Sequence, residues 1–108
     1  MDLAKKKCVP CEEGTPPLNA EEITKHKSQI PNWNVSADQK RISREFTFEN
    51  FLEAMAFANK ITAVAEEEGH HPDLHISWGK VGIELSTHAI KGLSENDFIL
   101  AAKIDTLV

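Results

Sequence analysis

The sequence predicts an α+β fold, a four-stranded antiparallel sheet with helices packed on one face, in the order α-β-β-α-β-β-α. Three segments carry a capping residue and a helical spacing of apolar residues, and shorter strand-like segments separate them. The strand-like segments fall into two pairs, each joined by a turn, which is typical of β-hairpins. Because each hairpin has one apolar face to cover, helices on one side of a single sheet are the economical arrangement.

The first half of this fold begins with a helix over about residues 19–29. Asn19 can cap the helix because Glu22 stands three residues later, and a proline stops it. A short strand is expected at residues 33–35. Residues 42–48 alternate apolar and polar side chains, which predicts a half-buried strand that pairs with the first.

The longest helix is expected over residues 50–68. Asn50 with Glu53 repeats the capping pattern, and Gly69 ends the helix. One apolar stripe runs along it, made of Phe51, Ala54, Phe57, Ala58, Ile61, Val64 and Ala65. This stripe should pack across the sheet and place Ile61 in the core.

A second hairpin is expected from residues 74–78 and 81–87, which alternate apolar and polar side chains around a glycine-lysine turn at 79–80. The last helix opens at Ser94, with Asp97 at the third position of a capping box. The apolar residues that follow leave at least one face of this helix for the core.

The chain divides into a leader over residues 1–17 and a single domain over residues 18–108. The leader combines a lysine run, acidic residues and prolines with little to bury, so we expect a flexible N-terminal arm. It carries Cys8 and Cys11 as a Cys-x-x-Cys pair. A structural zinc site would need a second pair, and a thioredoxin-like motif would follow a strand. Two thiols in a mobile arm are favoured, with cross-chain metal binding or redox sensing as the alternative.

Composition and charge exclude several classes of protein. The 108 residues make one domain, and 41% hydrophobic with 27% charged residues is ordinary for a globular chain. The net charge of −5 argues against direct nucleic-acid binding, which needs a basic face. No apolar run approaches the roughly 20 residues of a membrane-spanning helix, and no secretory signal is present. A cytoplasmic protein without membrane contact is therefore expected.

The histidines carry most of the chemical information. Four of the five lie within a 19-residue window, and His26 stands apart on the first helix, where it is expected to be exposed. A turn at 79–80 pairs residues whose numbers sum to about 159, which places His88 opposite roughly His71. His70 and His71 are adjacent in an extended segment and should have different tasks. Three imidazoles that titrate near neutrality would then converge, able to donate and accept protons.

This cluster leaves two chemical uses open, cofactor-free acid–base catalysis and a metal site. A tri-histidine zinc site would be one form of the second, although Pro72 removes the helix that would align His71 with His75. Purely structural roles also compete. Asp97 can serve only as a helix cap, Trp78 only as a core residue, and His75 only as an exposed strand residue.

Taken together, these residues resemble the signature of the pterin-4a-carbinolamine dehydratases. Its anchors are present at the expected spacing within residues 66–97. They are Glu66, His70, His71, Pro72, Trp78, His88 and Asp97. Residues 85–88 and 92–97 are similar to the family's strand–loop–helix segment, and the order of elements is similar over about residues 18–106. The leader lies outside this signature.

The resemblance implies dehydration of 4a-hydroxytetrahydropterin to quinonoid dihydropterin and water, in pterin cofactor recycling, with no metal and no organic cofactor. It implies that His70 and His88 carry the proton transfers and that His71 orients the pterin and shares catalysis. The implied substrate-binding residues are Gly69, His70, His71, Ser86, Thr87, His88 and Ala89. The implied supporting residues are Glu66, Pro72, Trp78 and Asp97, of which Glu66 and Asp97 would fix histidine tautomers.

The resemblance also bears on partners. Family members are similar in forming homodimers or homotetramers, and some animal members double as dimerisation cofactors of a transcription factor. The expected partners are a small pterin and further copies of the chain, without direct nucleic-acid or membrane binding. The alternative function is a protein-interaction module without catalysis.

Overall fold

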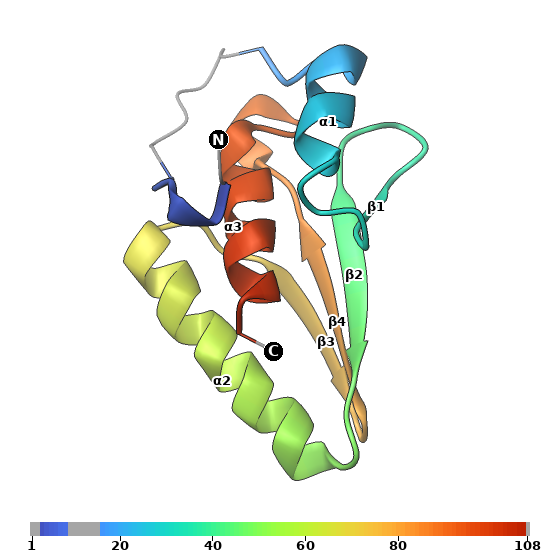
Figure 1. The fold of residues 1–108 in the computed structure, drawn as a ribbon, viewed down its shortest axis with the longest axis vertical. Helices are drawn as coiled ribbons and strands as arrows, with labels where there is room; N and C mark the ends of the chain where they lie inside the picture. The colour runs from blue at the N-terminus through green and yellow to red at the C-terminus, as the bar shows by residue number, and fades with distance from the viewer. Residues whose placement is uncertain (1–2, 9–15, 108) are drawn as a thin grey trace.

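The computed structural model describes residues 3–8 and 16–107, and within them it confirms the α+β prediction (Figure 1). The α-helices are α1 (Ala20–Lys27), α2 (Phe51–Glu68) and α3 (Glu95–Asp105). The strands are β1 (Asn34–Val35), β2 (Ile42–Thr47), β3 (Asp73–Ser77) and β4 (Lys80–Leu85). Two single-turn 3₁₀ helices, η1 (Leu3–Lys5) and η2 (His88–Ile90), complete the described elements.

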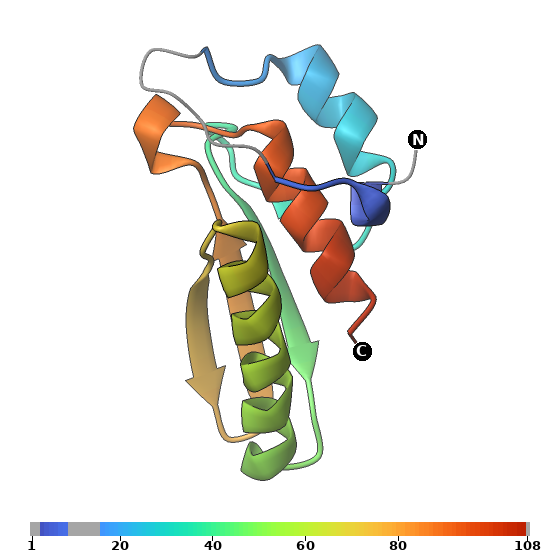
Figure 2. The same ribbon diagram turned by 90° about the vertical axis from the view of Figure 1, so that its left-hand side faces the viewer.

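The four strands form one antiparallel sheet in the order β1-β2-β4-β3. β2 and β4 pair at the centre, with Ile42 opposite Leu85. The helices α2 and α3 lie against the same face of this sheet, and α1 sits beside the far side of α3 (Figure 2). Because β3 and β4 are antiparallel, the loop that follows β4 and the loop between α2 and β3 lie at the same end of the sheet.

Capping residues set the helix ends as the sequence predicts. The Asn19 side chain accepts the Glu22 backbone N–H at 2.9 Å, and the Glu22 carboxylate accepts the Asn19 N–H at 3.0 Å. Asn50 caps α2 by accepting the Glu53 N–H at 2.8 Å. Gly69 ends α2 in the left-handed conformation with φ 66°, where a side chain would add strain.

The register of the β3–β4 hairpin differs from the prediction. Asp73 faces Glu84 and Ser77 faces Lys80, so the turn residues are Trp78 and Gly79. The turn keeps the expected two residues but lies one position earlier in the sequence. Gly79 packs closely there, since a Cβ on Gly79 would lie 2.9 Å from the Phe48 carbonyl oxygen. The strand β4 also ends at Leu85, two residues earlier than expected. His88 is therefore not paired opposite His71.

The core lies between the sheet and the two long helices. Its largest fully buried side chains from β2, β4 and α2 are Ile42, Ile61, Ile83 and Leu85, and α3 adds Phe98, Ile99, Leu100 and Ile104. Trp78 stands in the β3–β4 turn, so the competing interpretation of Trp78 as a core residue is wrong. The Trp78 side chain is 69% exposed, and Ile76 near the end of β3 is 36% exposed.

Residues 3–8 of the leader do not follow the expectation of an arm with little to bury. Leu3 is 1% exposed and packs in the core cluster, and η1 lies along α3. Cys11 and the other residues between 9 and 15 lie outside the described residues. The division into an arm over residues 1–17 and a domain over residues 18–108 stays a prediction.

Ile61 tests the packing of α2 on the sheet. Its side chain is fully buried, so Ile61→Ala should lower the free energy of unfolding by about 2–5 kcal/mol through lost burial and a residual cavity. Chemical denaturation measures this change. Lys60→Ala, at an exposed position one residue earlier, is the matched control and should shift stability by no more than about 0.5 kcal/mol. An Ile61→Ala protein as stable as the control would contradict this packing.

Candidate functional site

Two loops at one end of the sheet enclose a cavity of about 430 Å³. The first loop, residues 69–71, leaves α2 through the left-handed Gly69 and enters β3. The second, residues 86–89, leaves β4 and enters η2. Figure 2 shows the end of α2 and the short helix η2 toward the same, upper end of the sheet. The cavity is therefore built where two segments distant in sequence meet.

The structure brings all seven of the expected substrate-binding residues to this cavity, which are Gly69, His70, His71, Ser86, Thr87, His88 and Ala89. Three further lining residues come from outside that set, namely Cys8, Glu68 and Asn96. The substrate-binding role of the seven expected residues stays a prediction. Three histidines that line one cavity from two loops supply the groups that proton transfer requires.

His70 is held by a buried carboxylate. Its Nε2 lies 2.6 Å from Asp97 Oδ1, and the ring is 13% exposed while the Asp97 side chain is fully buried. An ionised carboxylate only accepts hydrogen bonds, so Nε2 carries the proton in this contact. In the neutral ring, Nδ1 is then the nitrogen that can accept a proton. The contact thus fixes both the tautomer and the orientation of His70.

Asp97 serves as a helix cap and as a histidine partner at once. Its second oxygen, Oδ2, accepts the Ser94 backbone N–H at 3.0 Å and the Thr87 hydroxyl at 2.8 Å. The Thr87 hydroxyl is also 2.8 Å from the Ser94 hydroxyl. These bonds satisfy a carboxylate that would otherwise be costly to bury. A role as a pure cap is therefore too narrow for Asp97.

His71 pairs with a carboxylate that does not itself line the cavity. Its Nε2 is hydrogen-bonded to Glu66 Oε2, and the two side chains are 61% and 70% exposed. Such an exposed pair adds little to stability, but it orients the ring. On the other side of His71, Pro72 and Glu66 line a separate small cavity against α2.

His88 is presented on a short loop. Thr87 and Gly92 close this loop with backbone hydrogen bonds of 2.8 and 3.4 Å, and Lys91 takes the left-handed conformation with φ 54°. His88 is the first residue of η2 and is exposed to solvent. The loop, rather than strand pairing with His71, brings this third ring to the cavity.

Three predicted positions lie elsewhere. Trp78 stands at the β3–β4 turn, at the opposite end of β4 from the cavity, so the structure does not bring it to the other supporting residues. His75 is exposed on β3 beside Gly82 and does not line the cavity. His26 is not merely exposed, since its side chain is 15% exposed and its ring packs 5.4 Å from that of Phe98.

The described residues hold neither a group of metal-ligating side chains nor a membrane-spanning helix. Among residues 3–8 and 16–107, no three histidine, cysteine or acidic side chains are grouped so that they could share a metal ion. No helix in that part of the chain combines the length and apolar character needed to cross a membrane.

The chain is similar to proteins of one family over nearly its whole length. The profile for pterin 4 alpha carbinolamine dehydratase matches residues 16–107. A relative from Alkaliphilus metalliredigens, provisionally named pterin-4-alpha-carbinolamine dehydratase, is 54% identical over 105 residues, which cover 96% of this chain and 94% of the relative. A relative of the same provisional name from Methylococcus capsulatus is 50% identical, over 97% of this chain and 92% of its own.

Solved structures of pterin dehydratase-like proteins are also similar to this chain, at lower sequence identity. A transcriptional coactivator/pterin dehydratase from Brucella melitensis has a TM-score of 0.80 and 26% identity, covering 84% of this chain and 97% of its own. A pterin dehydratase-like protein, described as a RuBisCO assembly factor in the alpha-carboxysome, has a TM-score of 0.61 and 25% identity. It covers 70% of this chain and 88% of its own.

Proposed function

The chain belongs to the pterin-4a-carbinolamine dehydratase family, and from that premise we propose that it dehydrates a 4a-hydroxytetrahydropterin by histidine acid–base catalysis. The observation that carries this proposal is the cavity lined by His70, His71 and His88, in which two of the three rings are paired with carboxylates. The products are a quinonoid dihydropterin and water. Recycling of a pterin cofactor is the process that this reaction would serve.

The reaction needs only proton transfers. The C4a–O bond breaks and the hydroxyl leaves as water after a general acid protonates it. A base removes the N5 proton, and the N5–H electron pair becomes the second bond of C4a=N5. Positioned imidazoles supply both functions near neutral pH, each contributing about 10²–10⁴-fold. The donors and acceptors balance within the substrate and the protein, so the chemistry needs no cofactor.

The environments of the rings suggest a division of labour. His70, held by the buried Asp97 carboxylate, can accept a proton because that carboxylate stabilises the imidazolium that forms. The exposed His88 can exchange its proton with solvent between turnovers. His71, whose ring is held by a hydrogen bond to Glu66, is suited to orienting the pterin. His70 and His88 are accordingly the proposed proton-transfer residues.

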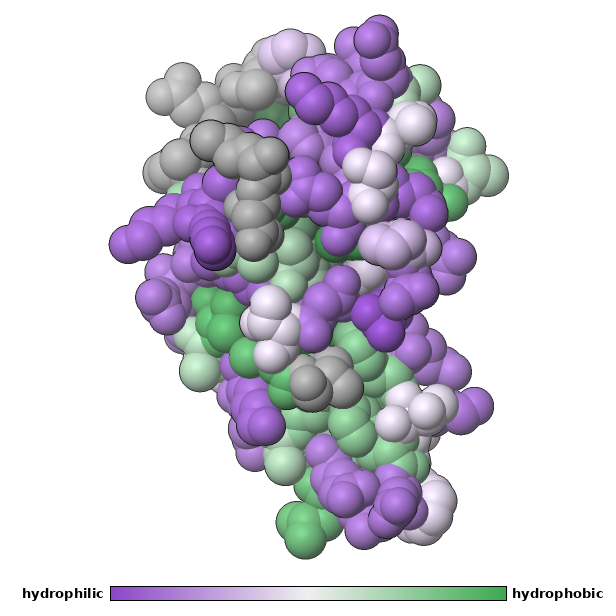
Figure 3. All heavy atoms as spheres, in the orientation of Figure 1, coloured by the Kyte–Doolittle hydropathy of each residue, from purple (hydrophilic) through white to green (hydrophobic). Residues whose placement is uncertain are grey.

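Assembly into homodimers or homotetramers is part of the proposal. Among residues 3–8 and 16–107, four large apolar side chains are exposed, namely Phe51, Leu52, Ile76 and Trp78. Figure 3 shows apolar side chains reaching the surface over the lower half of the face on which α2 runs. Exposed apolar residues beside an unpaired edge strand favour association with further copies. The same exposed apolar surface also supports the alternative function, a protein-interaction module without catalysis. The cytoplasmic location stays a prediction.

A stopped-flow assay tests the proposed function. Purified protein mixed with synthetic 4a-hydroxytetrahydropterin should convert it to the quinonoid product faster than the spontaneous dehydration, followed by absorbance. Extended dialysis against a strong chelator should leave the rate unchanged, since histidine acid–base catalysis needs no metal. A rate equal to the spontaneous one would contradict the function. A rate lost on chelation and restored by zinc would instead support a metal-dependent mechanism.

A further inference from the structure

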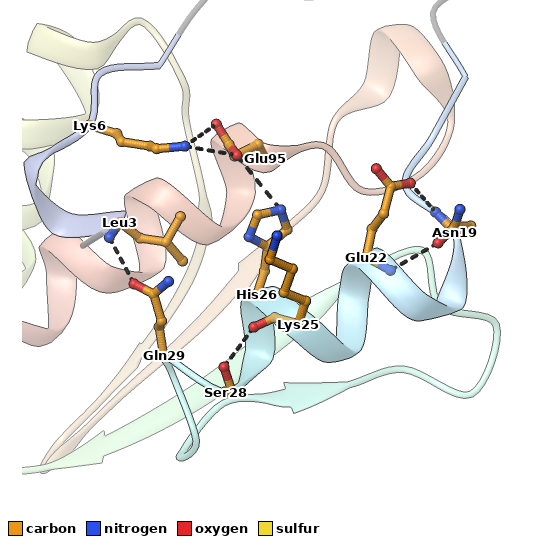
Figure 4. Close-up of polar contacts among 9 residues, drawn as sticks. All are labelled: Leu3, Lys6, Asn19, Glu22, Lys25, His26, Ser28, Gln29 and Glu95. Carbon is orange, nitrogen blue, oxygen red and sulfur yellow. Dashed lines mark hydrogen bonds and ion pairs between the residues drawn. The ribbon is translucent and has the colours of Figure 1, made fainter. Parts of the chain in front are cut away.

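The leader segment, defined here as residues 3–8, is fastened to the domain at its start. The Leu3 side chain is 1% exposed, and its backbone N–H donates to Gln29 Oε1 at 2.9 Å (Figure 4). Lys103 of α3 donates to the Ala4 carbonyl oxygen at 2.9 Å. The buried Leu3 side chain and two hydrogen bonds between the leader backbone and side chains of the domain hold the leader segment in one position along α3.

An ionic contact holds the middle of the leader segment. Lys6 Nζ lies 3.1 and 3.2 Å from the two carboxylate oxygens of Glu95, in the first turn of α3. Glu95 also lies 3.7 Å from His26 Nε2, so the same carboxylate links the leader segment to α1 (Figure 4). These contacts direct the chain toward the cavity rather than into solvent.

The end of the leader segment reaches the cavity. The Cys8 backbone N–H donates to Glu68 Oε1 at 2.8 Å, and Cys8 Sγ lies 3.6 Å from the Asn96 carbonyl oxygen. Cys8, Glu68 and Asn96 all line the cavity that His70 and His88 line. The Glu68 side chain is only 6% exposed, because the leader segment and Lys103 cover it. Two loops and the leader segment therefore bound one space.

We propose that the leader segment forms a third wall of the substrate cavity, and that Cys8 contacts the bound pterin as a specificity-determining residue. This inference rests on the proposed function. The leader segment precedes residue 16, where the match to the family profile begins, so the profile does not include this wall. Glu68 is the positioning residue that holds Cys8 there, which accounts for an acidic residue at the unfavourable C-terminal end of α2.

The thiol is suited to binding rather than to covalent chemistry. Burial, and then the negative charge of Glu68, raise the pKa of Cys8 from 9.0 to about 12. The group is therefore a neutral thiol at physiological pH, with little of the thiolate that acts as a nucleophile. A neutral, polarisable side chain offers van der Waals contact to a flat ring.

Ligand protection of the thiol tests this wall. In a Cys11→Ser background Cys8 is the one remaining cysteine, and its modification by methyl methanethiosulfonate can be followed by mass spectrometry. Adding 7,8-dihydrobiopterin at ten times its Kd should slow modification about tenfold, because few free molecules remain. The control is a Cys8→Ser, Cys11→Ser, Glu21→Cys protein, whose thiol on the exposed face of α1 should react equally fast with and without the pterin.

Steady-state kinetics give a second readout that a purely structural role would not produce. Cys8→Ala should raise KM about fivefold or more and leave kcat within about twofold, because a contact made in both ground and transition states is lost. Cys8→Ser should restore most of the affinity. Glu68→Ala should raise KM like Cys8→Ala, whereas Glu68→Gln keeps an acceptor for the Cys8 N–H and should raise it less.

The outcomes separate this inference from the proposed function. Wild-type turnover is measured on the same preparation as the labelling. Turnover together with protection of Cys8 and a raised KM supports the wall. Turnover with an unprotected Cys8 overturns the wall and leaves the dehydratase function standing. Absence of both pterin turnover and pterin binding overturns the two together.

Discussion

Replacing His70 or His88 with alanine is expected to lower kcat by about 10²–10⁴-fold and to change KM little. Each ring is proposed to move a proton in the transition state, so its loss removes an interaction that the ground state lacks. Both rings line the cavity, one held by Asp97 and the other on the η2 loop. Initial rates over a range of hydroxypterin concentrations measure the two parameters separately.

Substitutions of the other histidines supply the comparison for these changes in kcat and KM. His71→Ala should raise KM at least as clearly as it lowers kcat, if this ring mainly holds the pterin. The double change of His70 and His88 should cost less than the product of the single changes, because residues that act as a unit are not additive. His75→Ala, on the exposed strand outside the cavity, should behave like the wild type. An inactive His75→Ala beside a fully active His70→Ala would refute the assignment.

The substitution Asp97→Asn is expected to damage both stability and catalysis. Asp97 is fully buried and accepts hydrogen bonds from His70, Thr87 and Ser94, and an amide cannot accept all three with the same geometry. The free energy of unfolding should fall by roughly 2–4 kcal/mol, as for other buried hydrogen-bonded charges. The value of kcat should fall at least tenfold (an order-of-magnitude expectation), because the His70 tautomer is no longer enforced.

Glu66→Gln is the matched control for Asp97→Asn. It also replaces a carboxylate that pairs with a cavity histidine, but this pair is exposed to solvent. Its effect on stability should stay within about 0.5 kcal/mol. The value of kcat discriminates further, since losing the buried partner of His70 should lower it more than losing the exposed partner of His71. Equal effects of the two substitutions on stability and kcat would contradict the roles assigned to Asp97 and Glu66.

Local signals predicted the elements of this fold well. The caps at Asn19 and Asn50 and the left-handed end of α2 at Gly69 involve residues close in sequence, and the structure confirms them. Alternation could not decide the hairpin register, because the observed pairing of Ile76 with Val81 and the expected pairing of Ile76 with Ile83 both place apolar residues on one face. It also could not show that the chain turns at Trp78, which leaves this side chain exposed.

In the candidate site too, features that depend on neighbouring residues were predictable from the sequence, and contacts between distant residues were not. The histidines were identifiable because an imidazole has distinctive chemistry and because the family signature spaces them regularly. Local sequence identified Asp97 only as a cap, and its role as a histidine partner was implied by the resemblance, because its hydrogen bond to His70 joins residues 27 positions apart. Cys8 carried no local signal for the cavity, since its partners Glu68 and Asn96 are 60 and 88 positions away. Only the acidic end of α2 hinted that Glu68 had a further role.

A crystal structure with bound 7,8-dihydrobiopterin is the most direct test of the central claim that the histidine-lined cavity binds and dehydrates a hydroxypterin. This ligand keeps the flat pterin ring and lacks the labile 4a-hydroxyl. The account predicts the ring in the cavity between residues 69–71 and 86–89, with the imidazoles of His70 and His88 within hydrogen-bond distance of the C4a–N5 edge. A pterin bound at another surface, with both imidazoles away from that edge in a protein that still turns over its substrate, would contradict it.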